Sequence, residues 1–168
     1  MWKFCPLCAA SLEGQSNEMY GTCTSCGQHW YKNPKPTVGA YIVKSSNILL
    51  VRRAVEPRKG YWDIPGGFVR DDENPEEAVK RELREELSLE VINLKLIGVI
   101  GPEEYQYQKI TQKNFEISYL CGINESTPPS PSDDIDSVSW FPLDDLPEMA
   151  FKINTLGVAN LNNHILDH

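Results

Sequence analysis

The stretch from Gly67 to Leu89 constrains the fold and the chemistry of this chain more than any other. Asn74 is a preferred N-cap residue, Pro75 is tolerated at the first helical position, and Glu77 stands three residues after the cap, as in a capping box. We therefore expect a glycine-containing loop that leads into a helix beginning at Pro75.

The side chains of this helix divide into an apolar stripe and an acidic one. Val79, Leu83 and Leu87 recur every four residues, which predicts a face buried against a sheet. At 3.6 residues per turn, three carboxylates share one exposed edge beside that face: Glu82, Glu85 and Glu86. Each like-charge pair at this spacing costs about 0.2–0.5 kcal/mol, and a divalent cation would reverse the effect. Such oxygen ligands suit Mg²⁺ or Mn²⁺, although an ordinary solvated helix face has the same composition.

The spacing around the helix resembles the Nudix hydrolase signature. That signature has a Gly, a Glu, an Arg-Glu pair and a Glu-Glu pair at fixed intervals, and this chain supplies Gly67, Glu73, Arg81, Glu82, Leu83, Glu85, Glu86 and Leu89. The departure is Ser88, where the signature has a second glycine. That glycine would end the helix in a left-handed turn, so we expect serine to strain the C-cap by about 1 kcal/mol.

The resemblance implies an α+β fold, the Nudix α/β/α sandwich with a mixed sheet. It also implies Mg²⁺ or Mn²⁺ on Glu82, Glu85, Glu86 and the Gly67 carbonyl, with hydrolysis of a diphosphate as the reaction. Glu82, Glu86 or Asp134 would accept the proton of the attacking water. Arg81 and Glu73 would hold the loop to the helix through a charge-assisted pair.

The amino-terminal residues predict a separate zinc-binding module. Cys5 and Cys8 form one Cys-x-x-Cys knuckle, and Cys23 and Cys26 form a second one fourteen residues later. Four thiolates close a tetrahedral zinc site and leave no catalytic position, so the role is structural. Disulfides are the alternative, and the absence of an export signal argues against them. We expect His29 to be a surface or packing residue and Cys121 to be a small buried hydrophobe.

Composition and charge narrow the class of protein. The net charge of −8 over 168 residues argues against a nucleic-acid partner, which requires a basic surface. No apolar run approaches the ~18 residues of a membrane helix, and the first residues lack the apolar core of a signal peptide. We therefore expect a cytoplasmic protein that is independent of membranes.

The segment Asn33-Pro34-Lys35-Pro36 predicts a stiff linker between a zinc ribbon at residues 1–35 and a Nudix domain at residues 36–168. Within the second domain, apolar runs rich in β-branched residues predict strands, polar stretches predict loops, and a last helix closes the domain. The expected strands are Thr37–Val43 and Ile48–Arg53 as a hairpin, Leu89–Ile100, and Asn114–Ile123; the expected loop is Gly101–Lys113; and the last helix spans 150–166, with Phe151, Leu156, Val158 and Leu161 among its buried residues.

The candidates for substrate contact lie outside the helix. Arg53 ends a strand just before the Nudix loop, where similar Nudix proteins have a substrate-binding arginine. Tyr105 and Tyr107 stand two residues apart and either stack on a nucleobase or pack on the surface. The acid that reaches the metal site in several Nudix proteins matches Asp134, with Asp133 and Asp136 as rivals and a solvated turn as the alternative.

The four-cysteine ribbon followed by the helix resembles the zinc-ribbon Nudix proteins, which include the NADH pyrophosphatases. Those enzymes continue with a Ser-Gln-Pro-Trp-Pro-Phe-Pro type of segment, whereas this chain has Ile-Gly-Pro-Glu-Glu-Tyr-Gln-Tyr at 100–107. The expected substrate is therefore broader: a small nucleoside diphosphate linked to another group, as in ADP-ribose, FAD, NADH or a nucleotide sugar. The alternatives are a catalytically silent nucleotide-binding module and a ribbon that docks protein or RNA. The resemblance also allows a homodimer.

Overall fold

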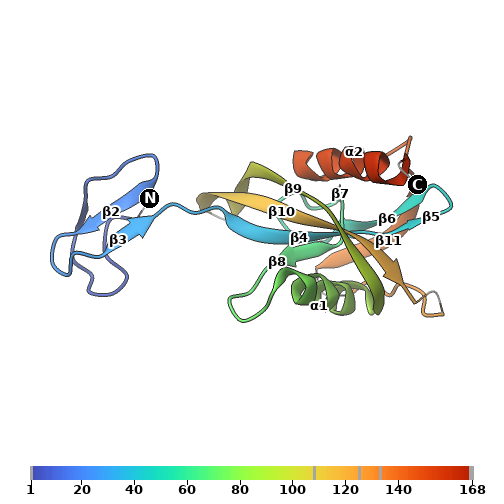
Figure 1. The fold of residues 1–168 in the computed structure, drawn as a ribbon, viewed down its shortest axis with the longest axis horizontal. Helices are drawn as coiled ribbons and strands as arrows, with labels where there is room; N and C mark the ends of the chain where they lie inside the picture. Colours follow the sequence, from blue (N-terminus) through green and yellow to red (C-terminus); the bar gives the residue numbers. More distant parts are fainter. Residues whose placement is uncertain (1, 108, 125, 133, 167–168) are drawn as a thin grey trace. The chain divides into compact units, whose positions relative to one another are not determined.

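The computed structural model describes residues 2–107, 109–124, 126–132 and 134–166 (Figure 1). Asp133 therefore lies outside the described residues, as do the side chains of Tyr107 and of residues 162–166. The chain divides into two compact units, Met1–Pro34 and Lys35–His168.

The first unit is a small antiparallel sheet. Its strands run in the order β1 (Leu12–Glu13), β2 (Met19–Cys23) and β3 (His29–Tyr31). Its buried core holds only Cys5, Leu12 and Cys23, with Tyr20 and Trp30 packed against them. A core this small buries too little apolar surface to stabilise a fold by itself.

The second unit has two sheets, one of which is mixed, with a helix on each side. This arrangement confirms the expected α/β/α sandwich (Figure 1). The first sheet has the order β8 (Gly66–Phe68), β4 (Lys35–Tyr41), β10 (Ile110–Ile123) and β9 (Val91–Tyr107), and only the β4–β10 pair is parallel. The second sheet has the order β11 (Ile135–Pro142), β6 (Asn47–Arg53) and β5 (Val43–Lys44), and β7 (Trp62–Asp63) also pairs with β6.

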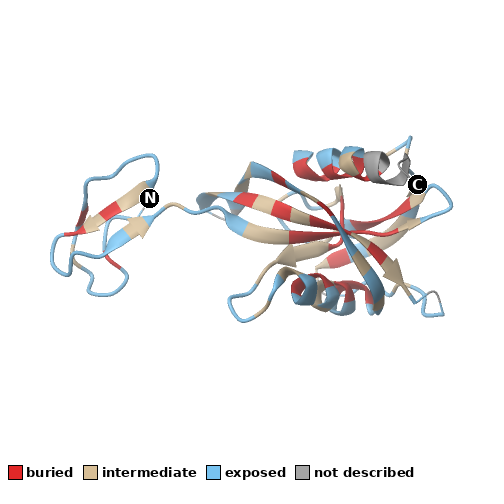
Figure 2. Ribbon diagram, in the orientation of Figure 1, coloured by how far each residue is buried: buried red, intermediate tan, exposed pale blue. Residues whose placement is uncertain are grey.

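Each helix buries its apolar side against the strands (Figure 2). The helix α1 (Pro75–Leu87) shares one core cluster with β4 and β10 residues such as Val38 and Cys121. The helix α2 (Lys152–Leu166) shares the other with Tyr41 and Leu50. The strands therefore hold the two helices on opposite faces, and the burial of Cys121 confirms its expected packing role.

The helix α1 begins and packs as its sequence predicts. The Asn74 side chain accepts a hydrogen bond from the Glu77 backbone N–H at 3.0 Å, and the Glu77 carboxylate accepts one from the Asn74 N–H at 2.9 Å. Val79, Leu83 and Leu87 are fully buried. Local capping and periodicity were therefore sufficient to define this helix.

The expected loop at 101–113 is wrong, because these residues extend two strands into one long hairpin. Strands β9 and β10 pair antiparallel from Val91 with Ile123 to Tyr107 with Ile110. Residues 101–106 are exposed or only partly buried. Glu103, Glu104 and Gln106 therefore combine polar side chains with backbones that pair in the sheet, which a search for apolar runs does not find.

The expected hairpin between 37–43 and 48–53 is also only partly correct. The first run divides at Ile42: β4 pairs with β8 and β10, and only the short β5 pairs with β6. The turn between β5 and β6 consists of Ser45 and Ser46, which both have positive φ. This geometry matches the twist of the two strands and explains why the turn is tight.

The last helix begins at Lys152, two residues later than expected. Val158 and Leu161 are buried as predicted, whereas Leu156 is 45% exposed and Phe151 precedes the helix. Ile153 and Asn154 take the buried positions at its start. The prediction for Leu156 was wrong, because the inward face of the helix includes a buried polar residue, Asn154, that apolar periodicity does not mark.

Ser88 occupies the left-handed conformation that the missing glycine would take, with φ 56° and ψ 30°. A side chain in this region costs about 1 kcal/mol, so Ser88→Gly should raise the free energy of unfolding by about 0.5–1 kcal/mol. Urea titration followed by circular dichroism measures the difference. Ser139→Gly in β11 is the control and should lower stability; a loss of stability in Ser88→Gly would contradict this account.

Candidate active site

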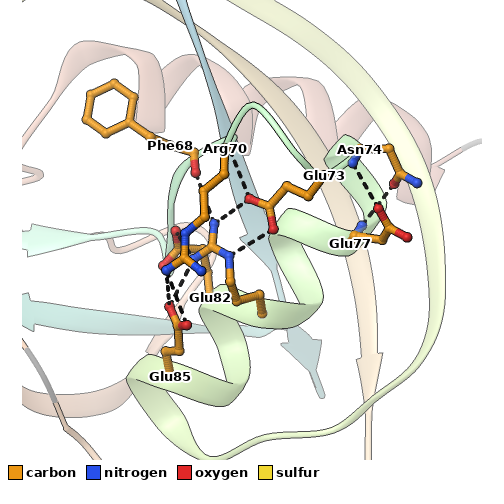
Figure 3. A network of polar contacts seen from close by, with 8 residues as sticks. Phe68, Arg70, Glu73, Asn74, Glu77, Glu82 and Glu85 are labelled. Carbon is orange, nitrogen blue, oxygen red and sulfur yellow. Dashed lines mark hydrogen bonds and ion pairs between the residues drawn. The ribbon is translucent and has the colours of Figure 1, made fainter.

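Arg81 joins the loop before α1 to the acidic edge of the helix, and Figure 3 shows the carboxylates of Glu73, Glu82 and Glu85 to which it donates. Its Nη2 and Nε donate to the two oxygens of Glu73 at 2.6 and 2.9 Å, and Nη2 also donates to the Phe68 carbonyl at 3.0 Å. Its Nη1 donates to Glu82 at 2.7 Å and to Glu85 at 2.9 Å. The expected pairing of Arg81 with Glu73 is therefore present, and the same guanidinium also holds two of the three helix carboxylates.

Hydrogen bonding by Arg81 lowers the pKa of Glu73 to about 2 from its ordinary 4.5. Because this pKa is lower in the folded state, ionised Glu73 stabilises the fold above pH 4.5, and the contribution disappears as pH falls from 4.5 towards 2. Glu73→Gln should thus cost about 1–3 kcal/mol at pH 7 and little near pH 2.5. Urea unfolding of both proteins across this range measures the difference, and a constant difference would contradict the assignment.

Glu86 lies in a different environment from the one that the sequence predicts. Its side chain is not on an exposed edge: the residue is 6% exposed, because the loop of Gly66 and Gly67 covers it. Its Oε2 accepts a hydrogen bond from the Gly66 N–H at 3.0 Å. Burial raises the pKa of Glu86 well above its usual value, and the charges of Glu82 and Asp134 raise it further. Helical periodicity alone could not predict a loop that folds over the helix.

Glu82 and Glu85 complete the acidic edge. Burial raises the pKa of Glu82, even though Arg81 opposes the shift. A Cβ at Gly67 would overlap the Glu82 carboxylate, so a glycine is required for this close approach. Glu85 is more open and also pairs with Arg70 at 3.3 Å. The structure therefore brings Gly67, Glu82, Glu85 and Glu86 together at the start of the loop.

This donor set fits a divalent cation. Its ligand atoms are hard oxygens, and burial, together with the charges of neighbouring carboxylates, raises the pKa of Glu82 and Glu86, so a cation would favour their ionised forms. Glu82, Glu85, Glu86 and the Gly67 carbonyl are the groups that would hold the ion. In the described part of the chain, only the cysteines form a group whose ligand atoms all lie within 4.8 Å of one another.

Of the acids in this segment that the structure describes, Asp134 is the one whose charge raises the pKa of Glu86. Its backbone carbonyl accepts a hydrogen bond from Ala54 at 2.7 Å, which fixes the segment at the end of β6. Asp136 instead lies 3.7 Å from Arg52, and both side chains are exposed. Asp134 therefore remains the candidate in this segment.

Arg53 is largely engaged inside the protein. Its Nη1 lies 2.8 Å from the buried Asp63 carboxylate, its Nε donates to the Pro57 carbonyl, and its guanidinium lies 5.3 Å from the Phe151 ring centre. It lines a cavity of about 100 Å³ that adjoins Gly66 and Gly67. Tyr105 lines the same cavity, and the side chain of Tyr107 lies outside the described residues.

Sequence reasoning missed most residues that line this cavity. The missed polar residues come from β7, β10 and α2: Asp63, Asn114, Glu116 and Asn154. The missed aromatic residues are Phe68 and Phe151. A signal was available for two of them. Asp63 and Glu116 each stand between apolar neighbours inside a strand, where a charged side chain requires an explanation.

The four ribbon cysteines come together as predicted. The Sγ atoms of Cys5 and Cys26 lie 3.8 Å apart and those of Cys8 and Cys23 lie 3.4 Å apart, and none forms a disulfide. Zn–S bonds of about 2.3 Å in a tetrahedron place sulfurs about 3.8 Å apart, so the group fits zinc. Backbone hydrogen bonds lower the pKa of Cys23 to about 6, which favours the thiolate that zinc binds. His29 is exposed and contacts Thr22, outside this group.

Comparison with known proteins agrees with the site geometry. A family model described as the NUDIX domain matches residues 33–158. The chain belongs to the Nudix family. A Nudix relative, the NAD-capped RNA hydrolase NudC of Pseudomonas aeruginosa, is 32% identical over 167 residues, which cover 98% of this chain and 54% of that protein. The ADP-ribose pyrophosphatase of Methanocaldococcus jannaschii is 34% identical over 122 residues, which cover 72% of this chain and 69% of that one.

Solved Nudix structures share the fold. A MutT NUDIX hydrolase from Burkholderia pseudomallei superposes with a TM-score of 0.68 at 28% identity, covering 77% of this chain and 99% of that one. The chain spans about half the length of the NudC relative.

Among the helices of the described residues, none is long and apolar enough to cross a membrane.

Proposed function

We propose that this Nudix protein is a Mg²⁺- or Mn²⁺-dependent hydrolase that cleaves the diphosphate linkage of a nucleoside diphosphate joined to another group. The observation that carries the proposal is the buried Glu86 carboxylate, held by the Gly66 N–H beside Glu82 and facing the charge of Asp134. Buried like charges are destabilising unless a cation offsets them, so a purely structural role does not explain their presence.

The residues have distinct roles in this proposal. Glu82, Glu85, Glu86 and the Gly67 carbonyl hold the cation, which when bound neutralises phosphate charge and makes water more acidic. A carboxylate that is not engaged with the cation accepts the proton of the attacking water: Glu82, Glu86 or Asp134. Arg81 and Glu73 position the loop and the helix, because their hydrogen bonds join these two elements.

The comparisons support a diphosphate as the substrate group. One relative is named for ADP-ribose and another for NAD-capped RNA, and both compounds contain a diphosphate between two ribose units. We propose a small-molecule substrate of this type, such as ADP-ribose, FAD, NADH or a nucleotide sugar, because the net charge of −8 disfavours an extended nucleic-acid contact. The ribbon formed by residues 1–35 is proposed to be a structural zinc module beside the hydrolase domain at 36–168.

A substrate panel tests this proposal. Purified protein is incubated with ADP-ribose, FAD, NADH, UDP-glucose and an NAD-capped oligoribonucleotide, with Mg²⁺, with Mn²⁺ and with neither. Released phosphomonoesters are then measured. We expect turnover of at least one diphosphate compound only when a divalent cation is present. Tight binding of a panel member without turnover under every condition would instead support the nucleotide-binding module.

A further inference from the structure

The cavity beside Gly66 and Gly67 ends in hydrogen-bond acceptors that lack donors. The Oδ1 atoms of Asn114 and Asn154 are buried and have no hydrogen-bond partner among the described residues, and the two residues are only 7% and 2% exposed. The orientation of Asn154 is determined by its Nδ2, which donates to the Asp63 carboxylate. Turning the amide would place Oδ1 against that carboxylate and repel it. A buried acceptor without a hydrogen-bond partner lowers the stability of the fold. A ligand that donates hydrogen bonds to these two Oδ1 atoms would therefore be stabilising.

Carboxylates add to the acceptor character of the cavity. Glu116 is 6% exposed, and its Oε1 accepts from Tyr41 at 2.8 Å and from Ser118 at 2.6 Å. Glu103 and Glu104 also line the cavity, and its lining cation, Arg53, pairs with Asp63. Acidic side chains therefore outnumber cationic ones in the cavity lining, so we expect it to hold a part of the substrate other than the diphosphate.

Aromatic rings also line the cavity. Tyr105 lies 6.0 Å from Phe68 at an interplanar angle of 86° and 5.4 Å from Phe151 at 43°, measured between ring centres. A flat ring can stack or pack edge-on against such rings. A bare metal ion would gain nothing from these rings.

We propose that this cavity holds the planar heterocycle at one end of the substrate and selects a heterocycle that donates N–H hydrogen bonds to Asn114 and Asn154. This chemistry is present in the amino group of adenine and in the carboxamide of a nicotinamide nucleotide. The inference rests on the proposed function for its link to catalysis, because the cavity adjoins the Gly67 backbone where the cation would bind. Selection of the heterocycle is separate from cleavage and can be measured without turnover.

Two matched pairs of phosphomonoesters test the selection. AMP is compared with purine riboside 5′-monophosphate, which lacks the amino group. Nicotinamide mononucleotide is compared with 3-acetylpyridine mononucleotide, which lacks the amide N–H and has the same charge. None of these probes has a diphosphate to cleave, so calorimetric titration with Mg²⁺ present reports binding alone. We expect the N–H-bearing member of at least one pair to bind about tenfold or more tightly than its partner. The pair that shows the difference identifies the heterocycle.

Variants then locate the selection in the cavity. Asn114→Leu and Asn154→Leu remove one acceptor each, and each should reduce the difference within the selected pair to about threefold or less. Asn93→Leu is the matched control, because Asn93 is exposed and bonds Gly122 at the opposite end of β10, and it should retain the full difference. If Asn154→Leu fails to fold because Asp63 loses a donor, Asn114→Leu alone still tests the assignment.

Affinities that agree within twofold in both pairs, or the absence of saturable binding by all four probes, would overturn the inference. So would an unchanged difference in a folded Asn114→Leu protein. These outcomes are distinct from failure of the proposed function, which would appear as no cation-dependent cleavage of any diphosphate while the selective binding of the phosphomonoesters persists.

Discussion

Glu86→Gln is expected to lower kcat for the diphosphate substrate by about 10²–10⁴-fold, because it removes a carboxylate from the cation and proton-transfer site. The same change should not unfold the protein. Burial raises the pKa of Glu86 above its value in the unfolded chain. The folded protein therefore loses stability as pH rises through this pKa and Glu86 ionises. Without added cation, the glutamine variant should therefore be at least as stable as the wild type at pH 7–8.

The opposite changes in activity and stability distinguish a catalytic role from a structural one. Steady-state kinetics gives kcat and urea unfolding gives the free energy of unfolding. Glu76→Gln is a suitable control, because Glu76 lies on the same helix with its side chain exposed, and it should retain turnover. A Glu86→Gln protein with full activity, or one that loses activity only because it unfolds, would contradict the assignment.

Cys23→Ser is expected to abolish zinc binding and to leave residues 1–34 without a fixed fold. Structural zinc contributes about 10–16 kcal/mol to the folding of comparable small modules, and this core has only three buried residues to replace it. Metal analysis should fall from about one zinc per chain to none. The near-ultraviolet circular dichroism of the ribbon aromatics should also weaken, since Trp2 stacks on Tyr20 at 4.8 Å only in the folded ribbon.

Cys121→Ser provides the matched control for zinc. Cys121 is buried in the other unit, so its replacement should lower the stability of that unit and leave the zinc content unchanged. Thiol titration separates zinc from the disulfide alternative. The denatured, chelated wild type should titrate all five thiols without reductant. Fewer thiols, together with the absence of zinc, would contradict the zinc assignment.

Local features of the sequence predicted the helix and the grouping of the four cysteines well. Asn74, Pro75 and Glu77 act within one turn of α1, and the paired cysteines act within short knuckles, so neither depends on distant parts of the chain. The left-handed Ser88 was predictable for the same reason, because a C-cap requires that conformation regardless of the tertiary fold.

Features that depend on distant contacts were harder to predict. The burial of Glu86 comes from the Gly66 loop, twenty residues earlier, and the long β9–β10 hairpin comes from cross-strand hydrogen bonds between polar residues. At the cavity, a hydrogen bond joins Asn154 to Asp63, and these residues lie 91 positions apart in the sequence. Periodicity reports which residues favour burial, but it does not report which polar residues will meet inside the fold.

Phosphorus NMR of the substrate selected in the panel tests the central claim most directly. With Mg²⁺ and catalytic amounts of protein, the two diphosphate resonances should be replaced by two phosphomonoester resonances of equal intensity, and no change should occur without the cation. The appearance of inorganic phosphate or pyrophosphate, or intact diphosphate resonances in the presence of bound protein and Mg²⁺, would contradict cleavage of the diphosphate linkage at the carboxylates of α1.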